Sequence, residues 1–229
     1  MSEGVNRVRR VSGISGILFV IAGVVAFILP GLPPKADEVA KIGTYFTGKR
    51  SELLTSNFVL GVAFVFFLIF VGALRAYLGA GDRDGLRPGA AMISGAGAAT
   101  ALTLAGGAVG NGAVFQVAAA GDANLNHALY DVANDLFIYS GFGFAAFFIG
   151  SAVAIAYSGG ALPRALVPAA AVIALLNVVG GIGLFAKTGF FAIGGAYSFI
   201  VPGVSLLWVL AVSVALLTRR APAASAAGP

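Results

Sequence analysis

Residues 53–74 of the chain read LLTSNFVLGVAFVFFLIFVGAL, a run of 22 residues without Asp, Glu, Lys or Arg. The run is bounded by a charged residue on each side, Glu52 and Arg75. About 20 mainly apolar residues in an α-helix cross the ~30 Å hydrocarbon core of a bilayer. This stretch therefore predicts a transmembrane helix, and it guides the interpretation of the rest of the chain.

Five further intervals lack these charged residues: 11–34, 88–121, 136–163, 165–186 and 188–218. They are continuously apolar, without the ~10-residue alternating segments of a transmembrane β-barrel. The sequence thus predicts an all-α, polytopic transmembrane helical bundle of about six spans. We expect the spans near residues 11–30, 54–74, 90–117, 136–158, 165–186 and 199–218. They form one domain over residues 1–220, followed by a disordered tail over residues 221–229, which is rich in Ala, Ser and Pro.

The composition agrees with a membrane protein and excludes several kinds of chemistry. Of the 229 residues, 59% are hydrophobic and 10% are charged, whereas roughly a quarter are charged in a soluble domain. Cysteine is absent and there is one histidine, which excludes disulfides, thiolate chemistry and a multi-histidine metal centre. Motifs for phosphate binding, metalloprotease or serine hydrolase activity are also missing. We therefore expect no catalytic residues, cofactor, metal site or nucleic-acid partner.

The basic residues predict the orientation in the membrane. With the N-terminus inside, nine Lys and Arg residues lie on the cytoplasmic side and five outside. An excess of basic residues marks the cytoplasmic side, and an even number of spans returns the chain to the side where it began. We expect both termini in the cytoplasm. The five outer basic residues are Lys35, Lys41, Lys49, Arg50 and Lys187.

The outer segment between the first two spans has a helical pattern of its own. Val39, Ile42, Phe46 and Leu53 recur at spacings of three, four and seven, which places them on one helical face. One interpretation is an interfacial helix that lies on the outer leaflet or caps the bundle. The alternative is an ordered connector with no role beyond packing.

A polar cluster precedes the fourth span. It consists of Asn124, His127, Asp131, Asn134 and Asp135, whose spacings place them on one face of a helix that leads into the membrane. His127 and Asp131 are i,i+4 neighbours and can form an imidazole–carboxylate pair. The cluster is either a polar mouth that binds a cation or a lipid headgroup, or the solvated face of a helix end.

Inside the spans there is no charged residue, which argues against an ion-coupled carrier. The polar residues that do occur there include Asn57, Asn111, Gln116, Tyr139 and Asn177. An Asn in such a place either coordinates a substrate or forms an interhelical hydrogen bond. The candidate ligand-binding residues are then Asn111, Gln116, His127, Asp131, Asp135 and Asn177.

Two spans stand out by composition. The span near 90–117 is rich in Gly, including the pair Gly106 and Gly110, and we expect it in the centre of the bundle, where helix backbones approach closely. The span near 54–74 contains Phe64, Phe66, Phe67 and Phe70, and we expect it to face lipid on at least one side.

The order of several short segments resembles a group of small actinobacterial six-helix integral membrane proteins of unknown function. The resemblance implies an all-helical bundle in the cell (inner) membrane and transfers no catalytic residues. The segments that carry it are 12–14 (SGI), 29–37 (LPGLPPKAD), 67–75 (FLIFVGALR), 128–131 (ALYD), 161–166 (ALPRAL) and 188–192 (TGFFA).

Three hypotheses for function follow. The first is a non-enzymatic accessory or structural bundle that packs against membrane lipids, another membrane protein or a second copy of itself. The second is a small solute carrier or lipid-handling protein with an outward-facing polar mouth; a cavity that reaches Asn111 and Asn177 would favour it. An intramembrane enzyme or redox subunit is the least supported.

Overall fold

The computed structural model describes residues 3–35, 37–79, 88–117, 121–186 and 188–218 of the chain. The predicted tail at 221–229 lies outside these residues. Within them the chain is helical and without strands. Six of the helices are long and apolar enough to cross a membrane, which confirms the predicted all-α bundle.

The long helices lie close to the predicted spans. They are α1 (Glu3–Ile28), α3 (Arg50–Gly79), α4 (Pro88–Gly112), α6 (Ala123–Tyr157), α7 (Leu166–Val179) and α8 (Tyr197–Thr218). A π-helical turn, η1 (Ala113–Val117), extends α4, and a 3-10 turn, η2 (Gly180–Leu184), extends α7. The predicted outer helix is α2 (Val39–Gly48).

The fourth long helix begins earlier than the apolar run predicts, at Ala123 instead of residue 136. Asp122 caps it, because its side chain accepts a hydrogen bond from the Leu125 backbone N–H at 3.0 Å. At 1.5 Å per residue the 35 residues of α6 are about 52 Å long, well beyond the ~30 Å of bilayer hydrocarbon. The polar segment predicted to lead into the membrane is thus the projecting first part of the same helix.

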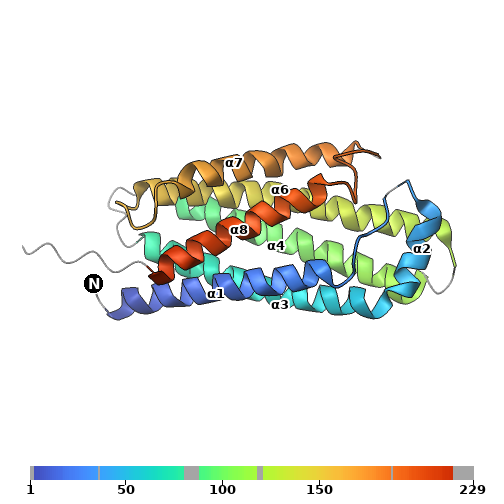
Figure 1. Cartoon of the computed structure of the whole chain (residues 1–229), viewed down its shortest axis with the longest axis horizontal. Helices are drawn as coiled ribbons and strands as arrows, with labels where there is room; N and C mark the ends of the chain where they lie inside the picture. The colour runs from blue at the N-terminus through green and yellow to red at the C-terminus, as the bar shows by residue number, and fades with distance from the viewer. Residues whose placement is uncertain (1–2, 36, 80–87, 118–120, 187, 219–229) are drawn as a thin grey trace, which may run out of the picture.

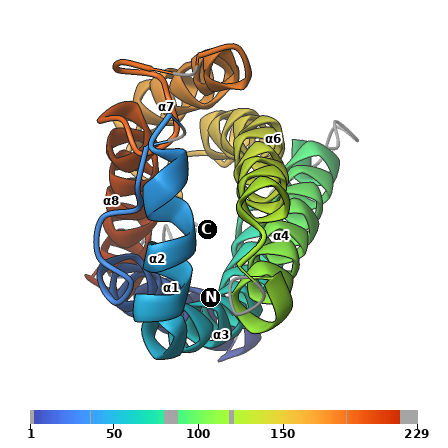
Figure 2. The same cartoon turned by 90° about the vertical axis from the view of Figure 1, so that its right-hand side faces the viewer.

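The six long helices form a ring in chain order. Each packs against the next, and α8 returns to pack against α1; Figure 2 shows this arrangement from one end. The start of α1 and the end of α8 lie at the same end of the bundle (Figure 1), which we call the termini end. The short helix α2 lies at the opposite end, the α2 end.

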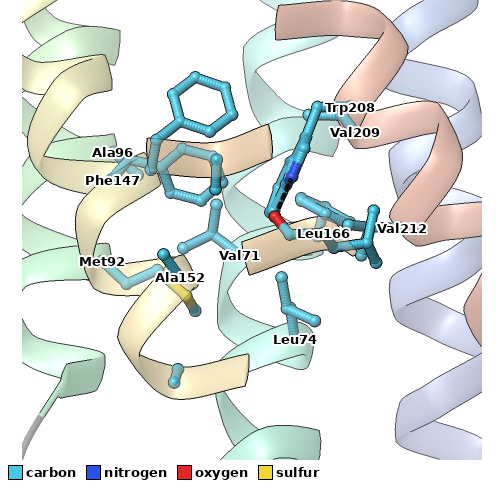
Figure 3. Close-up of a cluster of buried hydrophobic side chains, with 14 of the residues drawn as sticks. Val71, Leu74, Met92, Ala96, Phe147, Ala152, Leu166, Trp208, Val209 and Val212 are labelled. Atoms are coloured by element: carbon cyan, nitrogen blue, oxygen red, sulfur yellow. Dashed lines mark hydrogen bonds between the residues drawn. The ribbon is translucent and has the colours of Figure 1, made fainter. Parts of the chain in front are cut away.

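Aromatic side chains fill the ring toward the termini end. Phe67 lies at its centre, with ring centroids 4.8 Å from Phe19 and 5.2 Å from Phe147. Trp208 stacks edge-on against Phe148, at 5.2 Å between centroids, and donates a hydrogen bond from Nε1 to the carbonyl oxygen of Leu166 at 3.0 Å. Figure 3 shows this bond with part of the surrounding cluster. These aromatic side chains, Phe19, Phe67, Phe147, Phe148 and Trp208, fill the half of the ring nearer the termini end, and we call them the aromatic floor.

As expected, α3 presents an apolar outer side, but Phe64, Phe67 and Phe70 do not form it, because they are buried inside the ring. The surface of α3 is formed by other apolar residues, among them Phe58, Val65 and Ile69. Since every side of this helix is apolar, its sequence pattern does not distinguish the face toward lipid from the face toward the protein.

The Gly-rich helix α4 packs closely against α6. A Cβ on Gly95 would lie 2.4 Å from the backbone nitrogen of Phe147, and one on Gly143 would lie 2.5 Å from that of Ala99. The predicted close approach of backbones is therefore confirmed. The helix is a member of the ring, however, and is not central, and a Cβ on Gly110 would have nothing within 4 Å.

Candidate functional site

A cavity of about 430 Å³ occupies the half of the ring between the aromatic floor and α2. Each of the six long helices contributes to its wall. At the floor its lining includes Phe19, Phe67 and Phe147, and at the α2 end it includes Tyr45 and Phe46. Its volume falls in the range of ~300–1,000 Å³ that is typical of small-molecule sites.

The wall of the cavity is mainly carbon. Among the described residues that line it there is no Asp, Glu, Lys, Arg or His. Several of its polar side chains are bonded to backbone carbonyls: Ser56 Oγ donates to Ala26 at 2.7 Å, and Tyr197 Oη to Leu176 at 2.6 Å. Asn134 Nδ2 donates to Tyr130 at 2.7 Å. These donors are satisfied within the protein, whereas Thr103 Oγ1, also in the lining, is buried without a partner. The wall therefore best accommodates a mainly apolar molecule.

Helix α2 partly covers the cavity with its apolar face. Ile42 and Phe46 are 0% and 4% exposed and pack with Ala113, Val114 and Tyr130. The predicted helix is present, and its packing fits both the cap and the ordered connector that the sequence left open. Val39 is exposed, and Leu53 belongs to α3, from which it still packs against this cluster. The chain turns between α2 and α3 because Lys49 leaves the helical conformation.

Two tyrosine hydroxyls, one on α2 and one on α6, form hydrogen bonds with the segment that precedes α2. The Tyr130 hydroxyl donates to the carbonyl oxygen of Pro34, and the Tyr45 hydroxyl donates to that of Pro30 at 3.4 Å. Burial raises the pKa of Tyr45 to about 12, with a smaller contribution from the charge of Glu52. Its phenol therefore stays neutral and can act as a donor at physiological pH.

Two asparagines join α3 to α4 beside the cavity. Nδ2 of Asn57 donates to Oδ1 of Asn111 at 2.6 Å and also approaches the carbonyl oxygen of Gly107 at 3.4 Å. Asn57 lines the cavity, whereas Asn111 is not among its lining residues. The interhelical hydrogen bond that was one interpretation of these residues is thus present.

Asn177 lines the cavity from α7, where it is buried. Its Nδ2 donates to the carbonyl oxygen of Ile173 in the same helix at 2.9 Å. Its bonded partner lies within its own helix, in contrast to the Asn57–Asn111 pair. Of the two asparagines expected at such a cavity, it therefore reaches Asn177 but not Asn111, which contacts only the lining residue Asn57.

The remaining candidate residues lie outside the cavity lining. His127 Nε2 and Asp131 Oδ2 are 3.5 Å apart, as their spacing predicts, with side chains 34% and 45% exposed. Asp135 is half-buried farther along α6, and Gln116 is exposed at the end of η1. The structure therefore pairs His127 with Asp131 but does not gather the six candidates into one site.

Sequence reasoning did not assign the aromatic residues of the site. Tyr45, Tyr130, Phe137 and Tyr197 line the cavity together with Asn57. Asn57 is one of the polar residues within the spans, and only the folded structure shows that it bonds Asn111 on another helix and lines the cavity. The helical spacing of Ile42 and Phe46 was the one signal that indicated a cover over this end.

The described residues include no group of three or more His, Cys, Asp and Glu side chains that could hold a metal ion. Comparison of the chain with protein-family models, with curated proteins and with solved structures found no match. Fold and site together define a multi-pass α-helical membrane protein with an internal, uncharged cavity.

Proposed function

We propose that this protein is a lipid-handling protein of the cell (inner) membrane that binds one apolar chain inside its ring of helices. The observation that supports this function is the uncharged cavity, which ends at the aromatic floor on one side and is partly covered by α2 on the other. Burial of an apolar chain against such a wall is favourable because it removes apolar surface from water.

The dimensions of the cavity suit a single chain. Along α3 the lining runs from Leu53 to Phe67, a rise of about 21 Å at 1.5 Å per residue. A cavity that is long along the helices and mainly apolar suits an extended acyl or isoprenoid chain.

The same wall argues against transport of an ion or a strongly polar solute. Dehydrating an ion requires charges or several free dipoles in the protein, and the lining of this cavity contains no charged side chain among the described residues. A lipid chain needs no such groups. Of the solutes that a small carrier could handle, an amphiphile is therefore the best supported.

The accessory-bundle hypothesis remains a prediction beside this proposal. The outer surface of the ring exposes large apolar side chains, such as Phe58, Leu175 and Leu207, which would contact bilayer lipid, another membrane protein or a second copy. A tightly packed centre would have favoured a purely structural role. The cavity instead favours binding.

Trp208 provides the test, because it is the one tryptophan of the chain and stacks on Phe147 and Phe148, which line the cavity. We expect hexadecanol brominated near its terminal carbon to quench Trp208 fluorescence saturably, at one molecule per chain, in protein held in phosphatidylcholine nanodiscs. Unsaturable quenching that follows the bulk concentration in the bilayer would contradict the proposal.

Two substitutions in α4 separate the cavity from the lipid-facing surface. Gly110 lines the cavity, whereas Gly97 is exposed outside it, and a Cβ at either position would meet nothing within 4 Å. We expect Gly110→Leu to weaken binding about tenfold, since forcing methylenes into needed space costs ~1–3 kcal/mol. The matched control Gly97→Leu should bind as the parent protein does. Equal behaviour of the two variants would place the quencher outside the ring.

A further inference from the structure

A second depression, of about 490 Å³, lies on the surface between the segment Leu32–Pro34 and helix α2. We call it the α2 groove. In contrast to the cavity, it is lined by charged side chains, namely Glu38, Lys41 and Lys49. The groove and the cavity share two lining residues, Pro33 and Tyr45. A polar surface site and an apolar internal site therefore meet at these two residues.

The charged groups of the groove are positioned by neighbouring ion pairs. Lys41 Nζ lies 2.6 Å from Glu38 Oε1, and Lys49 Nζ lies 3.4 Å from Glu52 Oε1. Glu38 Oε2 also accepts the backbone N–H of Lys35 at 3.1 Å. The hydrogen bond from Lys41, followed by that from Lys35, lowers the pKa of Glu38, which therefore stays ionised.

The two lysines retain capacity for a ligand. An ammonium group has three N–H donors, and one ion pair uses only part of this capacity. Both lysine side chains are substantially exposed, at 68% and 48%. Around the groove three lysines, Lys35, Lys41 and Lys49, stand against the two glutamates that pair with them, Glu38 and Glu52. This small excess of positive charge favours an anionic group.

We propose that the α2 groove is a headgroup subsite, and that the ligand is a single-chain amphiphile with an anionic phosphate or carboxylate headgroup. Its headgroup lies between Lys41 and Lys49, and its chain passes Tyr45 and Pro33 into the cavity. This inference rests on the proposed function, because it assigns the polar end of the molecule whose chain the cavity holds.

The position of the groove agrees with the way an amphiphile lies in a membrane. Helix α2 crosses the end of the bundle (Figures 1 and 2), beyond the apolar lengths of the spans. Lysine and tyrosine side chains favour this interfacial level, where the polar tip is hydrated and the remainder is buried. Tyr45 meets both requirements, since its ring packs with the apolar cluster around Phe46 and its hydroxyl reaches Pro30.

The experiment compares two brominated probes of the same chain length, hexadecyl phosphate and uncharged hexadecanol, by quenching of Trp208 in phosphatidylcholine nanodiscs. We expect hexadecyl phosphate to bind about tenfold more tightly than hexadecanol, as charge-assisted hydrogen bonds are roughly twice as strong as neutral ones. The variant Lys41→Gln/Lys49→Gln should remove this preference and leave hexadecanol binding unchanged. Arg164→Glu, which is exposed near the termini end and changes the net charge by the same amount, should retain the preference.

A second substitution is expected to strengthen the binding of hexadecyl phosphate. A variant that merely disturbed the fold would weaken this binding, so the two effects can be told apart. Glu38→Gln removes the negative charge of the groove and releases Lys41 from its ion pair, so hexadecyl phosphate should bind severalfold more tightly. Free inorganic phosphate at millimolar concentration should compete with hexadecyl phosphate only weakly, because it lacks the chain; full displacement at that concentration would overturn the proposal.

The outcomes separate the two proposals. If hexadecanol binds saturably and Gly110→Leu weakens it, but the phosphate adds nothing and the lysine variant behaves as the parent, the headgroup subsite is wrong and the chain-binding function stands. If neither probe binds saturably, the chain-binding function fails, and the headgroup inference fails with it.

Discussion

Asn57 and Asn111 illustrate what a single pair of residues contributes to this bundle. Their hydrogen bond of 2.6 Å joins α3 to α4 next to the cavity. Both side chains are half-buried, so an asparagine that loses its partner is left with polar groups that water satisfies only in part. Interhelical hydrogen bonds in membranes are nevertheless modest, ~0.6 kcal/mol on average with a maximum of ~1.7.

We therefore expect a positive coupling energy between these two residues. Asn57→Leu and Asn111→Leu should each lower the free energy of unfolding by about 1 kcal/mol, and the double variant should lower it by little more than one of them alone. Reversible unfolding in mixed micelles, followed by far-UV circular dichroism, measures the three differences. Strictly additive losses would show that the two amides do not depend on each other.

At the scale of residues the sequence predicted some partners and missed others. The i,i+4 spacing gave the His127–Asp131 pair directly, because two positions on one helix have a fixed geometry. The inward direction of Phe64 and Phe67 was not predicted, since an apolar ring is equally compatible with lipid and with a protein interior. The Tyr130–Pro34 bond joins residues far apart in the sequence, and no local pattern indicates it.

At the scale of elements, the contact between α4 and α6 depends on glycine. Gly95 lies against the backbone of α6, whereas Gly97, two residues on, is exposed with open space around it. We expect Gly95→Ala to lower the free energy of unfolding by ~1–3 kcal/mol, because a methyl group would overlap the Phe147 backbone.

Gly97→Ala is the matched control in the same helix. It should leave stability unchanged or raise it by up to ~1 kcal/mol, since alanine is the better helix former. Thermal unfolding of both variants in the same detergent compares them. Equal stability of the two variants would mean that α4 and α6 are farther apart than the structure places them.

The elements themselves followed from the sequence, with errors at their ends that reach 13 residues where α6 begins at Ala123 instead of residue 136. Uninterrupted apolar runs located all six long helices, because the bilayer requires a minimum length of such residues. The apolar criterion failed at the start of α6, where a polar, well-capped helix precedes the apolar run. The short helix α2 was found by its spacing alone, and its burial depended on the ring that it covers.

At the scale of the whole molecule, the predicted orientation can be tested with engineered cysteines, because the native chain has none. Thr47 is exposed on α2, and Arg164 is exposed in the connection between α6 and α7 at the opposite end. We expect a membrane-impermeant maleimide added to intact cells to label Thr47→Cys and not Arg164→Cys. Labelling of Arg164→Cys alone would place both termini outside.

The ring and its cavity are properties of the whole molecule that the sequence did not indicate. Gly-rich helices predicted close packing, and α4 with α6 provides it, yet six helices in a closed ring leave space on the inside that side chains fill only at the floor. Whether such a space is filled depends on how side chains from all six helices meet. That arrangement cannot be derived from the pattern of any one helix.

The most direct test of the central claim is native mass spectrometry of the protein, extracted gently from its own membrane with lipids retained. The cavity of about 430 Å³ predicts one tightly held, single-chain molecule per protein, which Gly97→Leu retains and Gly110→Leu carries in a clearly smaller fraction of molecules. A protein that carries no such molecule, or whose bound lipids are the same in both variants, would contradict the claim that the ring of helices is a binding site.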